Sequence, residues 1–163
     1  MIHHVRGTVS EKHVGRVVID VGGVGLEILV TDGTWNEVGT AGDPVRLLTH
    51  MKVAEDAWTL YGFAHADERT VFRLLIGVQG VSPRVAVAIL SVLAPGALRR
   101  AVQEGDLDSL TAVTGVGKKI AQRILVDLRD RVGTMPAGAA RVVSGDPEAA
   151  GPDAAVDALV ALG

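Results

Sequence analysis

The sequence contains no cysteine and few aromatic residues. Without cysteine the chain has no disulfide, no thiolate metal ligand and no cysteine nucleophile. Aromatic residues make up only 3% of a chain that is 48% hydrophobic, so its core must be built from Val, Leu, Ile and Ala. Few rings are therefore offered for stacking on nucleic-acid bases.

Long hydrophobic runs and nucleotide-binding motifs are also missing. No run approaches the roughly 20 apolar residues of a membrane span, and the N-terminal residues lack the apolar stretch of a signal peptide. We therefore expect a cytoplasmic protein with no membrane partner. Gly117 has no glycine five residues upstream and Lys118 is not followed by a hydroxyl residue, so no Walker motif is present. The histidines lack metal-site spacing, and we expect no ATP hydrolysis by the chain itself, no metal and no cofactor.

The net charge of -3 is unevenly distributed along the sequence. Residues 1–65 carry five Lys or Arg against eight Asp or Glu, and residues 135–163 carry one against four. Residues 66–134 carry ten against seven and form the basic segment. A basic segment in an acidic chain favours a local contact with a polyanion such as nucleic acid.

Residues 1–63 alternate apolar and polar positions in short stretches separated by glycine, as in residues 16–21 and 25–30. This period predicts five or six short β-strands. So many strands in so few residues leave exposed sheet edges unless the sheet closes on itself. The sequence therefore predicts a small barrel of the oligonucleotide-binding (OB) type.

From residue 66 the apolar residues follow the helical period, which predicts an all-α domain of five helices over residues 66–132. Ser82 is placed to cap a helix whose first residue is Pro83, where the missing N–H of proline costs nothing. The starts of three further helices are marked by Pro95, Asp106 and Gly117.

The C-terminal part of the sequence differs in composition from the rest. Residues 133–152 are rich in Gly, Pro and Ala without an apolar period, which predicts a flexible linker. Residues 153–163 predict one more helix, whose apolar face needs partners that a single helix cannot supply. We interpret this helix as the start of a small C-terminal helical domain that is incomplete in this chain.

The helical segment contains an internal repeat. A shift of 35 residues aligns residues 80–86 (GVSPRVA) with residues 115–121 (GVGKKIA), and apolar positions on both sides stay in register. Each copy joins the end of one helix to the start of the next through a short glycine-containing turn, the pattern of a helix-hairpin-helix. The sequence therefore predicts tandem copies of this motif.

Both predicted turns have the chemistry of a phosphate-binding site. Small residues allow a phosphate to approach, and the start of the following helix offers free N–H donors and a positive dipole. Basic residues in that first helical turn are disfavoured by the dipole unless an anion is bound. Phosphate contacts read little sequence, so we expect sequence-independent DNA binding. The predicted contact residues are Gly80, Val81, Ser82 and Arg84 in the first hairpin and Gly115, Val116, Gly117, Lys118, Lys119 and Arg123 in the second.

Further motifs are spread over essentially the whole chain. Besides the two hairpins, they are Arg6-Gly7, residues 21–25 (VGGVG), Glu55-Asp56 ahead of residues 60–63 (LYGF), Glu68-Arg69-Thr70 and residues 158–163 (ALVALG). Together these motifs resemble the bacterial RuvA family, the Holliday-junction recognition subunits of the RuvAB branch-migration machine. One departure from the family pattern is Ser82, which stands where the family prefers a second glycine; we expect phosphate binding to persist there.

The resemblance implies structure-specific binding of four-way junction DNA in recombination and repair by a non-catalytic subunit of an ATP-dependent complex. Residues 1–63 would form an OB barrel that builds a homotetramer, acting singly or as paired tetramers, and residues 66–132 would hold the four arms open. Glu55 and Asp56 would form an acidic pin that repels phosphates and aids strand separation. The C-terminal domain would recruit the RuvB ATPase, and the RuvC resolvase is a further candidate partner.

Other interpretations of the same residues stay open at this point. Helix-hairpin-helix motifs also occur in DNA glycosylases and structure-specific nucleases, where Lys118 or Lys119 would act as a nucleophile or clustered carboxylates would bind Mg²⁺. An OB barrel is also typical of single-strand-binding proteins, which the scarcity of aromatic residues disfavours. The turns also fit ordinary helix corners with solvated lysines.

Overall fold

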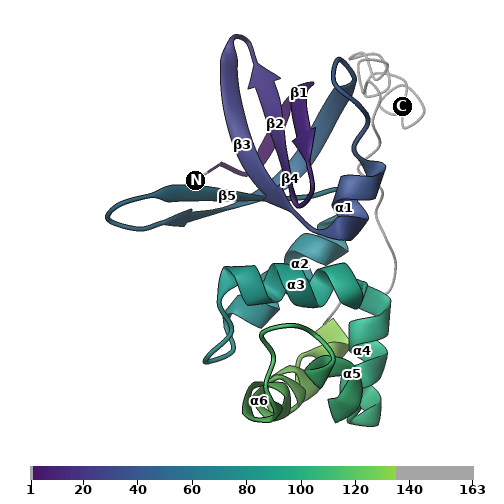
Figure 1. The fold of residues 1–163 in the computed structure, drawn as a ribbon. Coiled ribbons are helices and arrows are strands. Elements are labelled where there is room, and N and C mark those ends of the chain that lie inside the picture. Colours follow the sequence, from purple (N-terminus) through teal and green to yellow (C-terminus); the bar gives the residue numbers. More distant parts are fainter. Residues whose placement is uncertain (1, 135–163) are drawn as a thin grey trace, which may run out of the picture.

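The structure, a computed structural model, describes residues 2–134. A β-barrel lies at one end and a group of helices at the other, and the two parts are in direct contact (Figure 1). The predicted linker beyond Thr134 and the predicted helix at residues 153–163 lie outside the described residues.

Five strands close into a barrel in the order β1-β2-β3-β5-β4. Neighbouring strands are antiparallel except for β3 and β5, which run parallel. Closure pairs the sheet edges that a short meander would leave exposed, and the predicted OB-type barrel is confirmed. The strands are β1 (His4–His13), β2 (Arg16–Val21), β3 (Val24–Val30), β4 (Pro44–Val53) and β5 (Trp58–Phe63).

Alternate side chains of these strands fill the barrel. Val17, Ile19 and Ile28 are fully buried in its core. Gly7 allows β1 to approach β2 closely, because a Cβ atom at this position would collide with the carbonyl oxygen of Asp20. The alternation of apolar and polar residues in the sequence therefore reflects side chains that point in turn into the barrel and out of it.

A short helix, α1 (Asp32–Glu37), lies between β3 and β4, in a segment where the sequence predicted only strands. Thr31 caps it, since its Oγ1 accepts a hydrogen bond from the N–H of Thr34 at 3.1 Å. The N–H of Asp32 donates to the hydroxyl of Ser91 at 3.0 Å, which ties this helix to the helical part. A local cap thus decides the conformation where the strand pattern is interrupted.

The five predicted helices are confirmed. Ser82 caps the second of them, accepting from the N–H of Val85 at 3.3 Å, and Asp106 caps the fourth, accepting from the N–H of Ser109 at 3.0 Å. They are α2 (Ala66–Ile76), α3 (Pro83–Val92), α4 (Pro95–Glu104), α5 (Leu107–Thr111) and α6 (Lys118–Arg129), followed by the 3-10 turn η1 (Val132–Thr134).

Helix lengths within residues 2–134 are modest. None of these helices alone has the length and apolar content needed to cross a membrane. Among these helices, only α3 and α4 taken together have that length and apolar content, and the pair is bent by 93° at its junction.

Aromatic side chains join the barrel to the helices. Tyr61 and Phe63 of β5 pack against Phe72 of α2, with ring centroids 5.2 and 4.9 Å apart. All three rings are buried in the same hydrophobic cluster as the helices. Three of the five Phe, Trp and Tyr residues of the chain thus lie where they fix the two parts relative to each other.

A buried polar network lies beside this aromatic contact. The carboxylate of Glu68, at the start of α2, accepts hydrogen bonds from the hydroxyls of Thr31 and Thr34, the latter at 2.7 Å. The Thr34 hydroxyl also accepts from the N–H of Ala64 at 2.9 Å, so its own proton is directed at Glu68. Burial raises the pKa of Glu68 above its ordinary value. The network links α1, β5 and α2 at one point.

Candidate nucleic-acid interface

The two sequence repeats form turns of matching geometry, one between α2 and α3 and the other between α5 and α6. Gly80 and Gly115 have φ angles of +94° and +88°, in the region that favours glycine. The next residues, Val81 and Val116, donate their N–H groups to the carbonyl three residues earlier, at 3.1 and 3.0 Å. The repeat is therefore a structural one.

The two hairpins pack against each other reciprocally. A Cβ atom added to Gly80 would lie 3.8 Å from the side chain of Ile120, and one added to Gly115 would lie 3.6 Å from that of Val85. Val85 and Ile120 occupy the same position in the two repeats. Such exchanged contacts are what a local two-fold axis produces, and they bring both turns and the starts of α3 and α6 close together.

Val81 and Val116, which the sequence predicted as DNA contacts, have side chains only 6% and 5% exposed. Both belong to the helical core cluster. Their side chains therefore anchor the turns from inside, and their N–H groups are used within the turns. The residues around them, Gly80, Ser82, Gly115 and Gly117, are exposed.

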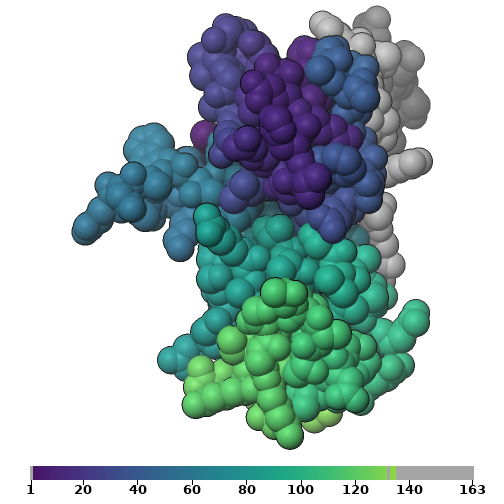
Figure 2. Space-filling model, viewed as in Figure 1, coloured from purple at the N-terminus to yellow at the C-terminus, as the bar shows by residue number. Residues whose placement is uncertain are grey.

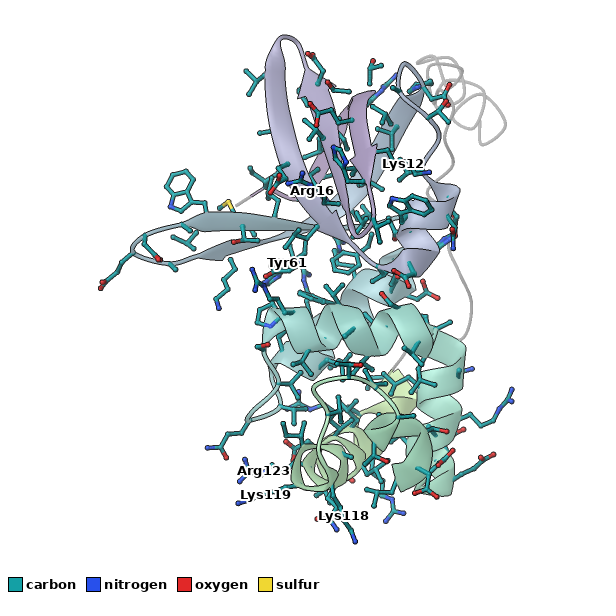
Figure 3. The ribbon with its side chains drawn as sticks, in the orientation of Figure 1. Lys12, Arg16, Tyr61, Lys118, Lys119 and Arg123 are labelled. Carbon is teal, nitrogen blue, oxygen red and sulfur yellow. The ribbon has the colours of Figure 1, made fainter. Side chains whose placement is uncertain are left out.

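Basic side chains occupy the first turns of both following helices. Arg84 of α3 and Lys118 and Lys119 of α6 are exposed, and none has an ion-pair partner within residues 2–134. Figure 3 shows Lys118 and Lys119 projecting from the start of α6. Unpaired cations at the positive end of a helix are unfavourable unless an anion neutralises them.

Arg123 of α6 lies beside Lys119 (Figure 3) but makes a contact that the other predicted basic residues lack. It is half-buried, and its Nη1 donates to the carbonyl oxygen of Gln79 at 3.4 Å. Gln79 directly precedes Gly80, so Arg123 connects the helix of the second hairpin to the turn of the first. The sequence placed Arg123 only with the second hairpin.

The start of α3 offers few free backbone donors. Pro83 has no N–H, and the N–H of Val85 is taken by the Ser82 hydroxyl at 3.3 Å. Of the first three residues of α3, only Arg84 thus keeps an N–H without an acceptor within the helix.

The start of α6 is different. Gly117 provides no side-chain cap, so the N–H groups of Lys118, Lys119 and Ile120 have no acceptor within the helix. The second hairpin accordingly offers more free backbone donors and more basic side chains than the first.

The acidic residues predicted as a pin lie far out on the barrel. β4 and β5 continue beyond it as a two-stranded arm, residues 51–60, which projects from the body of the molecule (Figure 1, Figure 2). Glu55 and Asp56 are exposed in the turn at its tip, closed by a hydrogen bond from Ala54 N–H to Ala57 O at 2.9 Å. Neither carboxylate has an ion-pair partner in the described part of the chain.

Two features of this arm were not predicted from the sequence. Trp58 is 77% exposed and pairs across the strands with Val53, which gives one face of the arm an apolar patch. Lys52 and Thr59 are paired on the other face, which borders a cleft against the start of α3. The alternation along β4 carries the signal for this, since Lys52 and Val53 must point to opposite faces.

Carboxylates are dispersed on the rest of the described surface. Asp127 and Asp130 are exposed on and directly after α6. Among residues 2–134, no three His, Asp or Glu side chains are arranged to hold a metal ion.

Two family models match consecutive parts of the chain. The model described as the RuvA N terminal domain matches residues 1–62, which contain the barrel and the arm. The model of the SAM-like helix-hairpin-helix tandem matches residues 72–130, which contain both hairpins.

Curated proteins named Holliday junction branch migration complex subunit RuvA are similar over most of the chain. The one from Symbiobacterium thermophilum is 46% identical over 168 residues, covering 100% of this chain and 82% of its own length. That from Streptomyces coelicolor is 50% identical over 142 residues, covering 87% and 70%. That from Mycolicibacterium smegmatis is 43% identical over 163 residues, covering 100% and 82%. The chain therefore belongs to the RuvA family.

Proposed function

We propose that the chain binds Holliday junctions, in DNA recombination and repair, as the DNA-recognition subunit of a branch-migration complex. The observation that carries this proposal is the pair of packed hairpins, whose helix starts present the unpaired cations Arg84, Lys118 and Lys119. These cations and the exposed turn residues form the proposed DNA contacts.

The reciprocal packing of the hairpins supports binding to a duplex backbone at two fixed points. Because Gly80 lies against α6 and Gly115 against α3, the packing sets the separation of the two turns. Two phosphate sites at a set separation recognise the spacing of a backbone rather than its base sequence. This favours recognition of DNA by its shape.

The arm supports recognition of the crossover itself. Glu55 and Asp56 repel phosphates, and at the tip of the arm they stand clear of the basic hairpins. We propose that the barrel builds a homotetramer in which four such acidic pins gather at the junction centre. A four-fold arrangement serves each of the four DNA arms with an identical subunit, and central repulsion keeps the strands apart.

We also propose that the subunit is itself non-catalytic. Without a Walker motif in the sequence, ATP-driven movement of the junction falls to a partner, proposed to be the RuvB ATPase, which a C-terminal domain would recruit. The RuvC resolvase is a further proposed partner, since an open four-way junction is the substrate that a resolvase cleaves.

Competition between DNA forms tests the binding proposal. The protein is titrated with a labelled four-way junction in the presence of unlabelled junction, duplex or single strand of matched sequence. We expect the junction to compete far better than the other two, and equal competition by all three would overturn junction recognition.

A second incubation tests the absence of catalysis. Labelled junction is kept with the protein and Mg²⁺ without any partner, and the DNA is examined on a denaturing gel with and without alkali. Intact strands are expected. Strand cleavage, or base release revealed by alkali, would show a nuclease or glycosylase.

A further inference from the structure

A cleft of about 230 Å³ separates the arm from the start of α3. We call it the arm cleft. Figure 2 shows the arm standing off from the helices on this side of the molecule, and Figure 3 places Tyr61 where arm and helices meet. The arm cleft is lined by Lys52, Ala54, Ala57, Thr59, Tyr61, Ser82, Pro83 and Arg84.

The charged side chains of the arm cleft are both positive. Lys52 comes from β4 and Arg84 from α3, and no carboxylate belongs to the lining. Within residues 2–134 neither cation has an ion-pair partner. Two like charges brought together from separate elements repel each other unless an anion lies between them.

The hydroxyl of a largely buried tyrosine adds a donor to this pair of cations. Tyr61 is only 4% exposed, its ring packs on Phe72 with centroids 5.2 Å apart, and its side chain reaches the cleft lining. Its hydroxyl makes no hydrogen bond within the described residues. Burial raises the pKa of Tyr61, with Arg84 opposing the shift, so the hydroxyl keeps its proton at neutral pH.

We propose that the arm cleft binds a phosphate of the DNA backbone, held between Lys52 and Arg84 with the Tyr61 hydroxyl as donor. This inference rests on the proposed function and deepens it, because Lys52 and Tyr61 belong to the barrel rather than to a hairpin. The first hairpin keeps one free N–H at its helix start. The side chains of the arm add donors beside a helix start where Pro83 has no N–H and the N–H of Val85 is bonded to Ser82.

The position of the arm cleft determines the course of a bound DNA strand along the arm. Lys52 lies only three residues before Glu55 on the same arm, so an attractive site at the base of the arm is followed by a repulsive one at its tip. A backbone held at Lys52 and excluded at Glu55 has to turn alongside the arm. The first hairpin, the arm cleft and the acidic pin thus form one continuous path for a strand.

Binding of a labelled four-way junction as a function of salt tests this inference in the whole chain. Lys52→Ala should weaken binding and lower the slope of log affinity against log salt by about one unit for the lost phosphate contact. Tyr61→Phe keeps the buried ring and should weaken binding with no change in slope. Arg100→Ala, on the exposed surface of α4, is the matched control for loss of one positive charge.

A double-mutant cycle tests whether Lys52 and Arg84 hold the same phosphate. Lys52→Ala with Arg84→Ala should lose less affinity than the product of the two single losses. A strictly multiplicative loss, or an effect of Lys52→Ala no larger than that of Arg100→Ala, would overturn the shared site.

Two further outcomes separate the competing explanations. Suppose that Lys52→Ala leaves the junction affinity unchanged but alters the oligomeric state measured by light scattering. The arm cleft then holds an acidic residue of another copy of the chain, and the phosphate site is refuted. If Lys118→Ala weakens junction binding while Lys52→Ala does not, the arm cleft fails and the proposed function stands. If the unaltered protein shows no preference for junctions, the proposed function fails first.

Discussion

Replacing Lys118 and Lys119 together with Ala should change stability and DNA affinity in opposite directions. Both lysines are exposed at the start of α6 without an ion-pair partner among residues 2–134. Each cation in the first turn of a helix costs about 0.3–1 kcal/mol. Removing both should raise the free energy of unfolding by about 0.6–2 kcal/mol. For a chain of this size, each kcal/mol raises Tm by about 2–4 °C.

The same substitution should weaken DNA binding most at low salt. Each lost phosphate contact lowers the slope of log affinity against log salt by about 0.9, so two contacts give about 1.8 for each engaged subunit. A fourfold rise in salt, from 50 to 200 mM, should then shrink the affinity deficit of the variant about 12-fold. This salt dependence separates the loss of phosphate contacts from a general loss of folding.

Thermal unfolding without DNA and anisotropy titrations of a labelled junction measure the two effects. Arg129→Ala is the matched control, because Arg129 lies in the last turn of the same helix, where a cation is favourable. It should lower stability slightly and leave the salt slope near that of the unaltered protein. A lower Tm for the Lys118/Lys119 variant, or an unchanged salt slope, would refute the assignment of an anion site to this helix start.

Two further predictions concern the arm and the junction between barrel and helices. Glu55→Gln with Asp56→Asn should preserve or tighten DNA binding and reduce the preference for junction over duplex in competition; a collapse of binding would contradict the repulsion argument. Burial raises the pKa of Glu68 above its ordinary 4.5, so the native state holds this proton more tightly than the unfolded state. Its contribution to stability is therefore full below pH 4.5 and lost as pH rises through the folded pKa. Urea unfolding of Glu68→Gln across this pH range should lack that component, and identical pH profiles for the two proteins would refute it.

The features that the sequence predicted well depend on residues that are neighbours along the chain. The caps at Ser82 and Asp106, and the turns at Gly80 and Gly115, need only a few consecutive residues, and all four are present. The repeat adds a check, because a shift of 35 residues preserves both the turn and the apolar positions beside it. Local chemistry and its duplication were therefore sufficient to predict the tandem hairpins.

The features that the sequence did not predict depend on how distant elements pack. Helix α1 replaces a predicted strand, and the hydroxyls of Thr31 and Thr34 at its start donate to Glu68, which lies in a different helix. Lys52 was not selected because its proposed role depends on the length of the arm and on the start of α3 lying across the cleft from it. Arg123 was assigned to the second hairpin, although its side chain crosses to Gln79 of the first. Each of these contacts joins segments that the sequence alone does not bring together.

The contact between barrel and helices connects these results. The ring of Tyr61 packs on Phe72, and the Tyr61 side chain also lines the arm cleft. Glu68 binds the hydroxyls of Thr31 and Thr34 close by. The direction of the arm relative to α3 is therefore fixed by a buried core and not by surface loops. A junction strand in the arm cleft would meet a preformed site, which reduces the ordering cost of binding. The polar network at Glu68, which makes none of the proposed DNA contacts, should therefore affect junction preference as well as stability.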